Sequence, residues 1–332
     1  MLNSFVRLRW VKGSVVGLLL LGCSSSGETN PVEGSAGSGG SAGSAASAGN
    51  SSGGGSVVPE ADVHGSVIVS LLPASGGDDA YATLTGRFFD GPTPDVLQLE
   101  LASEAGECQL LVPFAPFCNE ACAPGVCTAD DECTPYPKPL GLGSLDISGL
   151  GDALNLKPAS AMQVYQAPSM PNPPCEAGAQ VSATAADYGL TLEAECIGQL
   201  ELTGPDPVPV MSGEPVVVSW STSGSAPSSR VLIRLDIAHH GGKKGEIVCD
   251  VPDSGEFSIP EPLVTELVGL GLAGYPDISV TRVARGVDAK HENAVLVLSS
   301  NVLRPVDTGV ASCQETSQCP DDQVCLDTKV CG

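Results

Sequence analysis

Cysteine is the residue type with the most chemistry available to it in this 332-residue chain, and 13 cysteines are present. Thiolates that bind zinc or exchange disulfides are commonly paired as C-x-x-C, and no such pair occurs here. Apart from Cys23, an even set of twelve remains, which in an exported chain is typical of a disulfide framework. We therefore predict no metal and no cofactor, and structural disulfides among Cys108, Cys118, Cys122, Cys127, Cys133, Cys175, Cys196, Cys249, Cys313, Cys319, Cys325 and Cys331.

Eight of these cysteines form two dense groups. The first runs from Cys118 to Cys133, and the second has four cysteines spaced six residues apart, from Cys313 to Cys331. Four cysteines allow three pairings, and their spacing does not choose among them. We expect each group to close within itself, which leaves four cysteines to join strands: Cys108, Cys175, Cys196 and Cys249.

Two glycine motifs match enzyme patterns but stand in the wrong context. Residues 39–43 match G-x-S-x-G, which needs a strand-turn-helix corner, whereas here the match lies in a Gly/Ser/Ala repeat. Residues 269–274 match G-x-G-x-x-G, which must follow a strand and open a helix, whereas here it follows a predicted helix. Neither motif is therefore assigned a catalytic or nucleotide-binding role.

Two other patterns could bind metal ions. His239 and His240 are adjacent, and neighbouring side chains on a strand point to opposite faces, so a solvated turn is favoured over a shared metal. The acidic runs 130–132 and 321–322 lie inside the cysteine groups and could offer carboxylates to calcium. Because no D-x-D-x-D-G loop is present, calcium binding stays an alternative.

Residues 1–22 have the pattern of an export signal. Three basic residues precede the apolar run 14–21, which is too short to span a bilayer, since about 20 residues are needed. The following Leu20-Leu21-Gly22-Cys23 resembles the bacterial lipobox. This resemblance implies cleavage before Cys23 and acylation of Cys23. Because Ser24 follows, it also implies an outer-membrane location, on the periplasmic or the surface face.

The charge of the mature chain excludes some partners. Removing residues 1–22 leaves 12 basic against 39 acidic residues, a formal net charge of −27. Such a surface repels nucleic acid and anionic lipid. The expected partners are therefore a membrane, bound through the acyl chains on Cys23, and an envelope or surface protein, with no nucleic acid.

Strand patterns dominate the chain beyond a low-complexity segment. Residues 23–56 reduce largely to Ser, Gly and Ala, a composition that cannot repay the entropy of folding, so we predict a disordered tether. One helix is expected near residues 261–270, because Pro262 suits a first helical turn. Alternating or β-branched apolar residues predict strands at 67–72, 96–101, 190–194, 231–237 and 294–298.

The predicted fold is mainly β, with two sandwich-like domains. Closely spaced prolines at 207–210 predict a hinge. Residues 213–220 and the following strand resemble the second and third strands of immunoglobulin-like domains, which implies such a sandwich at 206–305 with Trp220 in its core. The other predicted parts are a β domain at 57–205 with an inserted cysteine-rich module at 108–133, and a cysteine-rich C-terminal module at 306–332.

The sequence specifies a location better than an activity. Residues 121–127, 253–260 and 319–325 resemble surface lipoproteins of myxobacteria, and this resemblance implies a place at the envelope rather than a reaction. Aromatic residues make up only 4% of the chain, which counts against stacking on sugars. We expect a lipid-anchored, non-enzymatic binding or structural protein. The alternatives are an envelope-displayed hydrolase or other enzyme and a calcium- or ligand-binding module.

Overall fold

The computed structural model describes residues 63–159, 162–238, 242–272, 275–309, 313–319, 323–326 and 331. All of them belong to one compact unit, Asp62–Gly332. The predicted signal peptide, Cys23 and the predicted tether at 23–56 lie outside the described residues.

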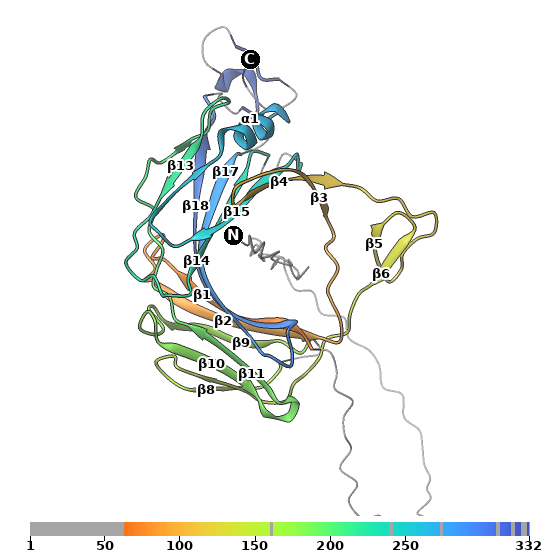
Figure 1. Ribbon diagram of the computed structural model, residues 1–332, viewed down its shortest axis with the longest axis vertical. Coiled ribbons are helices and arrows are strands. Elements are labelled where there is room, and N and C mark those ends of the chain that lie inside the picture. Colours follow the sequence, from red (N-terminus) through yellow and green to blue (C-terminus); the bar gives the residue numbers. More distant parts are fainter. Residues whose placement is uncertain are drawn as a thin grey trace, which may run out of the picture. The chain divides into compact units, whose positions relative to one another are not determined.

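A large mixed sheet of ten strands organises the unit (Figure 1). Its strand order is β3-β4-β15-β14-β17-β18-β1-β2-β9, and β12 pairs with β18 beside this path. Neighbours are antiparallel except β1 with β18 and β12 with β18, which are parallel. The strands are β1 (His64–Leu72), β2 (Tyr81–Phe89), β3 (Gln98–Ala105), β4 (Cys108–Phe114), β9 (Tyr165–Pro171), β12 (Val208–Pro209), β14 (Arg230–Asp236), β15 (Glu246–Pro252), β17 (Asp277–Val287) and β18 (Ala294–Asp307).

Three smaller sheets accompany the large one. A four-stranded sheet has the order β11-β10-β7-β8, and two antiparallel pairs join β13 to β16 and β5 to β6. Their strands are β5 (Gly125–Ala129), β6 (Glu132–Pro135), β7 (Leu145–Ser148), β8 (Leu154–Leu156), β10 (Gln180–Ala185), β11 (Leu190–Glu195), β13 (Val216–Ser219) and β16 (Glu256–Ile259). The helices are α1 (Glu261–Gly269) and the short 3-10 turns η1 (Ala186–Tyr188) and η2 (Thr316–Gln318).

Alternation along the strands decides which face of the large sheet is buried. In β1, Val67, Val69 and Leu71 are at most 1% exposed, while the residues between them are partly exposed. Successive side chains of a strand point to opposite faces, so one face of β1 packs and the other does not. The packed face meets the four-stranded sheet, in a core that includes Leu84, Leu192 and Leu298.

A second core covers the other half of the same face. It joins Ile233 of β14 and Val280 of β17 to the β13–β16 pair and to α1, whose Leu263 and Leu267 are buried. Val280 of the second core and Ala284 of the first occupy alternate positions of one strand, so both cores lie on one side of the large sheet. In Figure 1 this is the convex side of a curved sheet.

The predicted strands and helix are confirmed, but their arrangement differs from the expectation. The helix forms at Glu261–Gly269, and β3 begins at Gln98 rather than at residue 96. Residues 57–205 and 206–305, predicted as separate domains, contribute to one sheet, because β1 pairs with β18 and β4 with β15. Periodicity predicts strands but carries no information about partners so distant in sequence.

Two details of the predicted second domain are also resolved. Trp220 is 3% exposed and lies in the second core, as predicted. The predicted hinge at residues 207–210 instead packs into the fold: Val208 and Val210 are buried, and Val208–Pro209 pairs with the end of β18. Pro209 is accommodated because this two-residue strand lies beside the main path of the sheet.

Candidate functional site

The face of the large sheet opposite both cores is the strongest candidate for a functional surface. Its members follow from register, because paired residues on neighbouring strands point to the same side; Arg87, for example, pairs with Ser66, and Ser66 with Val295. We call this surface the open face. Its members include Ser66, Ile68, Ser70, Thr83, Thr85, Arg87, Arg230, Leu232, Arg234, Val248, Asp250, Ser279, Thr281, Val283, Arg285, Val287, Val295, Val297, Ser299 and Asn301.

Polar side chains dominate the open face, and most of them are partly exposed. The Asn301 amide donates to the hydroxyl oxygens of Ser279 and Thr281, at 2.6 and 2.7 Å. The hydroxyls of Ser70 and Ser299 lie 3.4 Å apart. Hydroxyl, amide and guanidinium groups of this kind recognise a ligand through hydrogen bonds, and aliphatic residues such as Val287, which is 60% exposed, provide contact area between them.

Ion pairs hold three arginines of the open face in place. Arg230 Nε lies 2.7 Å from Asp250 Oδ1, and Arg285 Nη1 lies 3.8 Å from Asp250 Oδ2. Arg234 Nε lies 3.2 Å from Glu246 Oε2, a carboxylate bordering the face that is itself buried. The arginine side chains are 42–46% exposed, so solvent screens these pairs and they add little stability. Their main effect is to position the guanidinium groups.

The opposite, core-facing side of β17 contains a buried ion pair. Arg282 is fully buried, and its Nε lies 2.6 Å from Asp253 Oδ2. Asp253 also accepts hydrogen bonds from the Trp220 indole, at 2.7 Å, and from the hydroxyls of Ser225 and Ser229. The remaining guanidinium donors reach backbone carbonyls of residues 199, 221 and 223. Every partner is internal, so this network ties the loop 221–229 to the sheet.

The carboxyl of Asp253 is held in its charged form by this network. Burial raises the pKa of Asp253, but hydrogen bonds from Arg282, Ser225, Ser229 and Trp220 outweigh it, and the pKa lies below its ordinary value. Asp288 is similar. Burial raises its pKa, but hydrogen bonds from backbone N–H groups of the β17–β18 loop and of Thr191 outweigh this effect, so its pKa also lies below the ordinary value. These shifts belong to carboxylates that hold loops in place rather than to a reactive cleft.

All twelve predicted cysteines are disulfide-bonded. Each dense group closes within itself, as Cys118–Cys127 and Cys122–Cys133 in the first and as Cys313–Cys325 and Cys319–Cys331 in the second. The other two disulfides are Cys108–Cys249, between β4 and β15, and Cys175–Cys196. A framework of this density indicates an extracytoplasmic protein.

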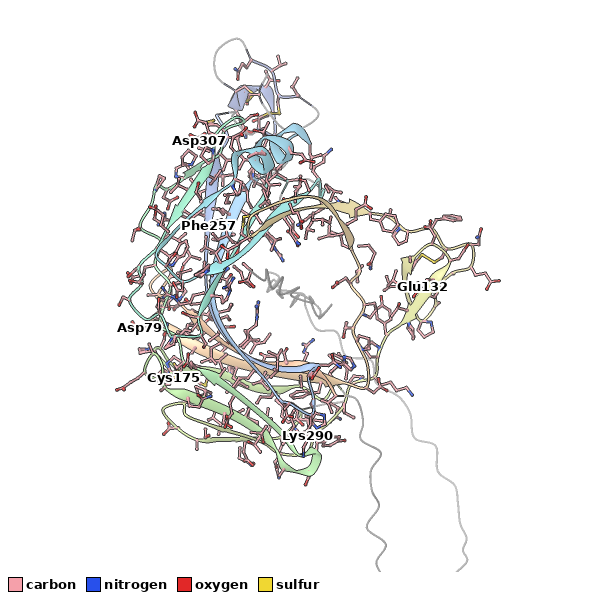
Figure 2. All side chains as sticks on the ribbon, viewed as in Figure 1. Asp79, Glu132, Cys175, Phe257, Lys290 and Asp307 are labelled. Atoms are coloured by element: carbon pink, nitrogen blue, oxygen red, sulfur yellow. A yellow bond between two sulfur atoms is a disulfide. The ribbon has the colours of Figure 1, made fainter. Side chains whose placement is uncertain are left out.

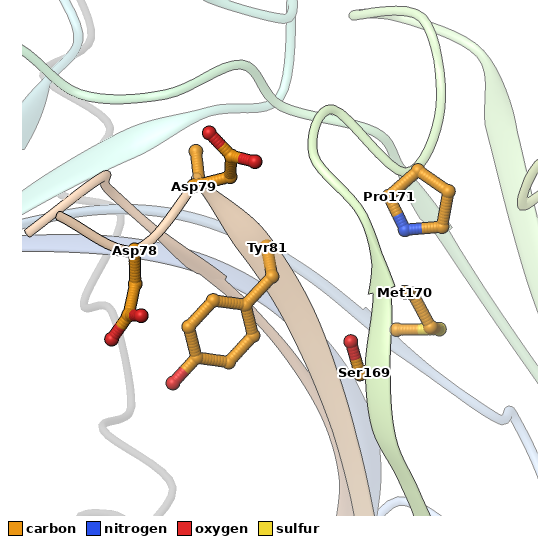
Figure 3. A pocket seen from close by; sticks show the side chains of 7 residues that line it. Asp78, Asp79, Tyr81, Ser169, Met170 and Pro171 are labelled. Atoms are coloured by element: carbon orange, nitrogen blue, oxygen red, sulfur yellow. The ribbon is translucent and has the colours of Figure 1, made fainter.

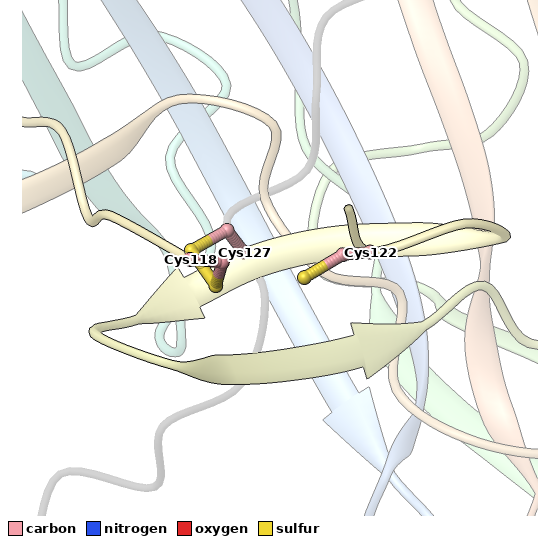
Figure 4. A group of neighbouring side chains, drawn as sticks. All are labelled: Cys118, Cys122 and Cys127. Carbon is pink, nitrogen blue, oxygen red and sulfur yellow. A yellow bond between two sulfur atoms is a disulfide. The ribbon is translucent and has the colours of Figure 1, made fainter. Parts of the chain in front are cut away.

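Sulfur atoms gather closely enough in both groups to suggest a metal site, but their chemistry does not fit one. Cys118, Cys122 and Cys127 lie together at the β5–β6 hairpin (Figure 4), and three sulfurs of the C-terminal group do the same. A metal ligand must be a thiolate, and each of these sulfurs is bonded to another. The close sulfurs are therefore two interlaced disulfides in each group.

The acidic loop at residues 130–132 makes a turn. Asp131 has a φ of 57° and accepts hydrogen bonds from the backbone N–H and the side-chain amide of Asn119; these bonds lower its pKa. Its carboxylate is thus engaged in closing the loop. The second acidic run at 321–322, the His239–His240 pair, residues 39–43, and residues 273–274 of the second glycine motif lie outside the described residues.

A shallow hollow lies between the first residue of β2, with the residues before it, and the last residues of β9 (Figure 3). Asp78, Asp79 and Tyr81 line one side, and Ser169 to Pro171 line the other. It is widely open to solvent and brings together no nucleophile held beside a general base, which an active site requires. We assign it no role.

The comparisons with known proteins leave the chain without a family. No protein-family model matches it, and no curated protein matches it. Among the described residues, no helix has both the length and the apolar character needed to cross a membrane. The function is therefore inferred from the surface itself.

The open face was missed by sequence reasoning, although a signal for it was present. The apolar positions of each strand predict its buried face, and the positions between them face the other side. These second positions repeat hydroxyl and arginine residues, as in Ser66 and Ser70, or Arg230 and Arg234. Figure 2 shows side chains on both faces of the large sheet. Only the strand order brings these residues onto one surface.

Proposed function

We propose that this chain is an exported lipoprotein, acylated at Cys23 and held at the outer membrane, that acts as a non-enzymatic binding protein through its open face. The lipobox-like residues 20–23 and the six disulfides support export and anchoring. The observation that carries the binding role is the open face itself. It is a sheet surface with ordered, partly exposed hydrogen-bonding side chains, and both cores lie on its other side.

The open face is suited to bind through side chains rather than through its backbone. The N–H and C=O groups of its central strands are paired with neighbours on both sides, so a ligand cannot be added as a further strand there. Recognition falls to guanidinium, hydroxyl and amide groups whose positions are fixed by ion pairs and by the Asn301 contacts. Such preorganisation lowers the entropic cost of binding.

The proposal is tested by changing one exposed residue of the open face. All proteins carry Cys23→Ser, which removes the acyl anchor. Arg285→Glu reverses one charge on the open face. Lys157→Glu, the control, reverses one charge at the residue that follows β8. Binding of each protein to isolated outer membranes is measured by co-sedimentation.

We expect Arg285→Glu to weaken binding at least tenfold and Lys157→Glu to leave it within twofold. Equal binding by all three proteins, or no binding by the unchanged chain, would refute a binding role for the open face. Unfolding midpoints of the variants, followed by circular dichroism, show whether each one keeps its fold.

A further inference from the structure

Arg87 differs from every other described arginine. Each of the other five lies within 4.0 Å of a carboxylate: Arg230, Arg234, Arg282, Arg285 and Arg304. The side chain of Arg87 has no ion pair and no hydrogen bond among the described residues, and its Nε is buried without a partner. The chain has 39 acidic residues against 15 basic ones, so a shortage of acidic groups does not explain the unpaired arginine.

Two further free donors accompany Arg87 on the open face. Ser66 is its direct partner across β1 and β2, and Thr85 lies two residues before it on the same strand and the same face. Directly opposite residues have their Cβ atoms about 5 Å apart, and residues two apart on a strand about 7 Å apart. Like Arg87, both are partly exposed, and neither hydroxyl makes a hydrogen bond within the described part of the chain.

A guanidinium beside two free hydroxyls is a donor set for an oxyanion. Arginine stays charged at any physiological pH and presents N–H groups in a planar fork that matches carboxylate, sulfate and phosphate oxygens. Each hydroxyl adds one more donor. A buried donor without a partner is costly, because folding removes its water without replacing it, so a ligand that pairs with this group gains affinity.

We propose that Arg87, Ser66 and Thr85 form a binding site for an oxyanion group on the open face. This inference rests on the proposed function, because it names the chemistry that one part of the open face recognises. The oxyanion comes either from a free ion or from an acidic glycan of the envelope, and the experiment separates these sources. Since the Nε of Arg87 is buried, contact with it requires a rotation of the guanidinium, whereas the hydroxyls of Ser66 and Thr85 need no such change.

The test is isothermal titration calorimetry on the full chain in detergent. The probes are inorganic sulfate, inorganic phosphate, polygalacturonate as a carboxylated glycan, and dextran as a neutral one. The variants are Arg87→Met, Arg87→Lys, Ser66→Ala and the near-isosteric Thr85→Val, with Lys157→Met as the control that removes one positive charge elsewhere. Trp220 fluorescence verifies the fold of each variant.

We expect the unchanged chain to bind at least one anionic probe and not dextran. Arg87→Met should weaken that binding at least tenfold, Thr85→Val and Ser66→Ala about threefold each, and Lys157→Met less than twofold. Arg87→Lys keeps the charge but loses the fork, so its affinity should be intermediate. If Arg87→Met unfolds, Arg87→Lys and the two hydroxyl variants decide the question.

The possible results have distinct meanings. Binding of sulfate or phosphate without polygalacturonate identifies a free-ion site, and tighter binding of the polymer identifies a glycan site. Failure of every anionic probe, or equal affinity in Arg87→Met and the unchanged chain, overturns the inference. The open-face function would then survive if Arg285→Glu still weakened outer-membrane binding at least tenfold. Conversely, anion binding without any envelope binding would support the anion site and refute the proposed function.

Discussion

The buried pair of Arg282 and Asp253 allows a sharp prediction about stability. Replacing Asp253 with Asn preserves the size of the side chain but removes its charge. Arg282 is 0% exposed and the Asp253 side chain 3%, so the variant leaves a guanidinium charge inside the protein with no opposite charge. Removing one partner of a buried pair costs about 3–5 kcal/mol. We expect Asp253→Asn to lie near the lower figure, because its amide oxygen can still accept a hydrogen bond.

The loss should be visible as a large change in melting temperature. For a domain of this size, 1 kcal/mol shifts the midpoint by about 2–4 °C, so we expect a fall of about 6–12 °C. Trp220 donates its indole N–H to Asp253 at 2.7 Å and is the only tryptophan outside the predicted signal peptide. Its fluorescence therefore reports both the local change and global unfolding.

A double variant separates the charge from the packing. Replacing both partners, as Asp253→Leu with Arg282→Met, removes the uncompensated charge, so the loss should be smaller than the sum of the two single losses. Unfolding is followed by denaturant titration at pH 7 without reductant. If Asp253→Asn costs less than 1 kcal/mol, or if the single effects simply add, the reasoning about this pair is refuted.

Three further outcomes are expected from the same structure. Because the pKa of Asp253 is lowered in the folded protein, its charge stabilises the fold at pH values above the ordinary pKa near 3.9, and this stabilisation is lost as the pH falls through the folded pKa. In an acid titration, the free energy of unfolding should therefore fall more steeply with decreasing pH for the unchanged chain than for Asp253→Asn. A Cβ added at Gly286 would lie 1.5 Å from the Glu193 carbonyl oxygen, whereas a Cβ added at Gly269 would have no neighbour within 4 Å. In urea titrations, Gly286→Ala should therefore lower the free energy of unfolding by about 3 kcal/mol, and Gly269→Ala should not lower it. Equal effects of the two substitutions would contradict the close approach of β11 to β17. The disulfide Cys108–Cys249 joins residues 141 apart in sequence, and its removal should lower the free energy of unfolding by about 5 kcal/mol. The disulfide Cys175–Cys196 joins residues 21 apart, and its removal should lower it by about 3 kcal/mol. Calorimetry of the two double-alanine variants measures both losses, and a larger loss for Cys175–Cys196 would contradict this prediction.

The sequence predicted local structure well because local structure is written in periodicity. The alternation in residues 67–72 and 231–237 specifies strands with one buried face, and the stripe of Leu263, Val264 and Leu267 specifies a helix. The pairing of β1 with β18 could not be predicted, since it joins segments more than 220 residues apart in sequence. Both predicted domains, 57–205 and 206–305, contribute strands to this one sheet.

The candidate site could be predicted from the sequence only in part. Arg87 and Ser66 belong to one hairpin, and their pairing depends only on the turn between β1 and β2. Arg285 reaches the same face through β17 and β18, so the sequence alone could not place it there. The unpaired state of Arg87 is a property of three-dimensional surroundings, which no motif encodes.

The most direct test of the central claim, an exported and acyl-anchored binding protein, is the intact mass of the membrane-extracted chain before and after reduction. We predict a chain that begins at Cys23 and carries diacylglyceryl and acyl groups, with no thiol open to alkylation until reductant frees twelve. A chain without lipid, a chain that begins elsewhere, or one with many free thiols before reduction would contradict the account.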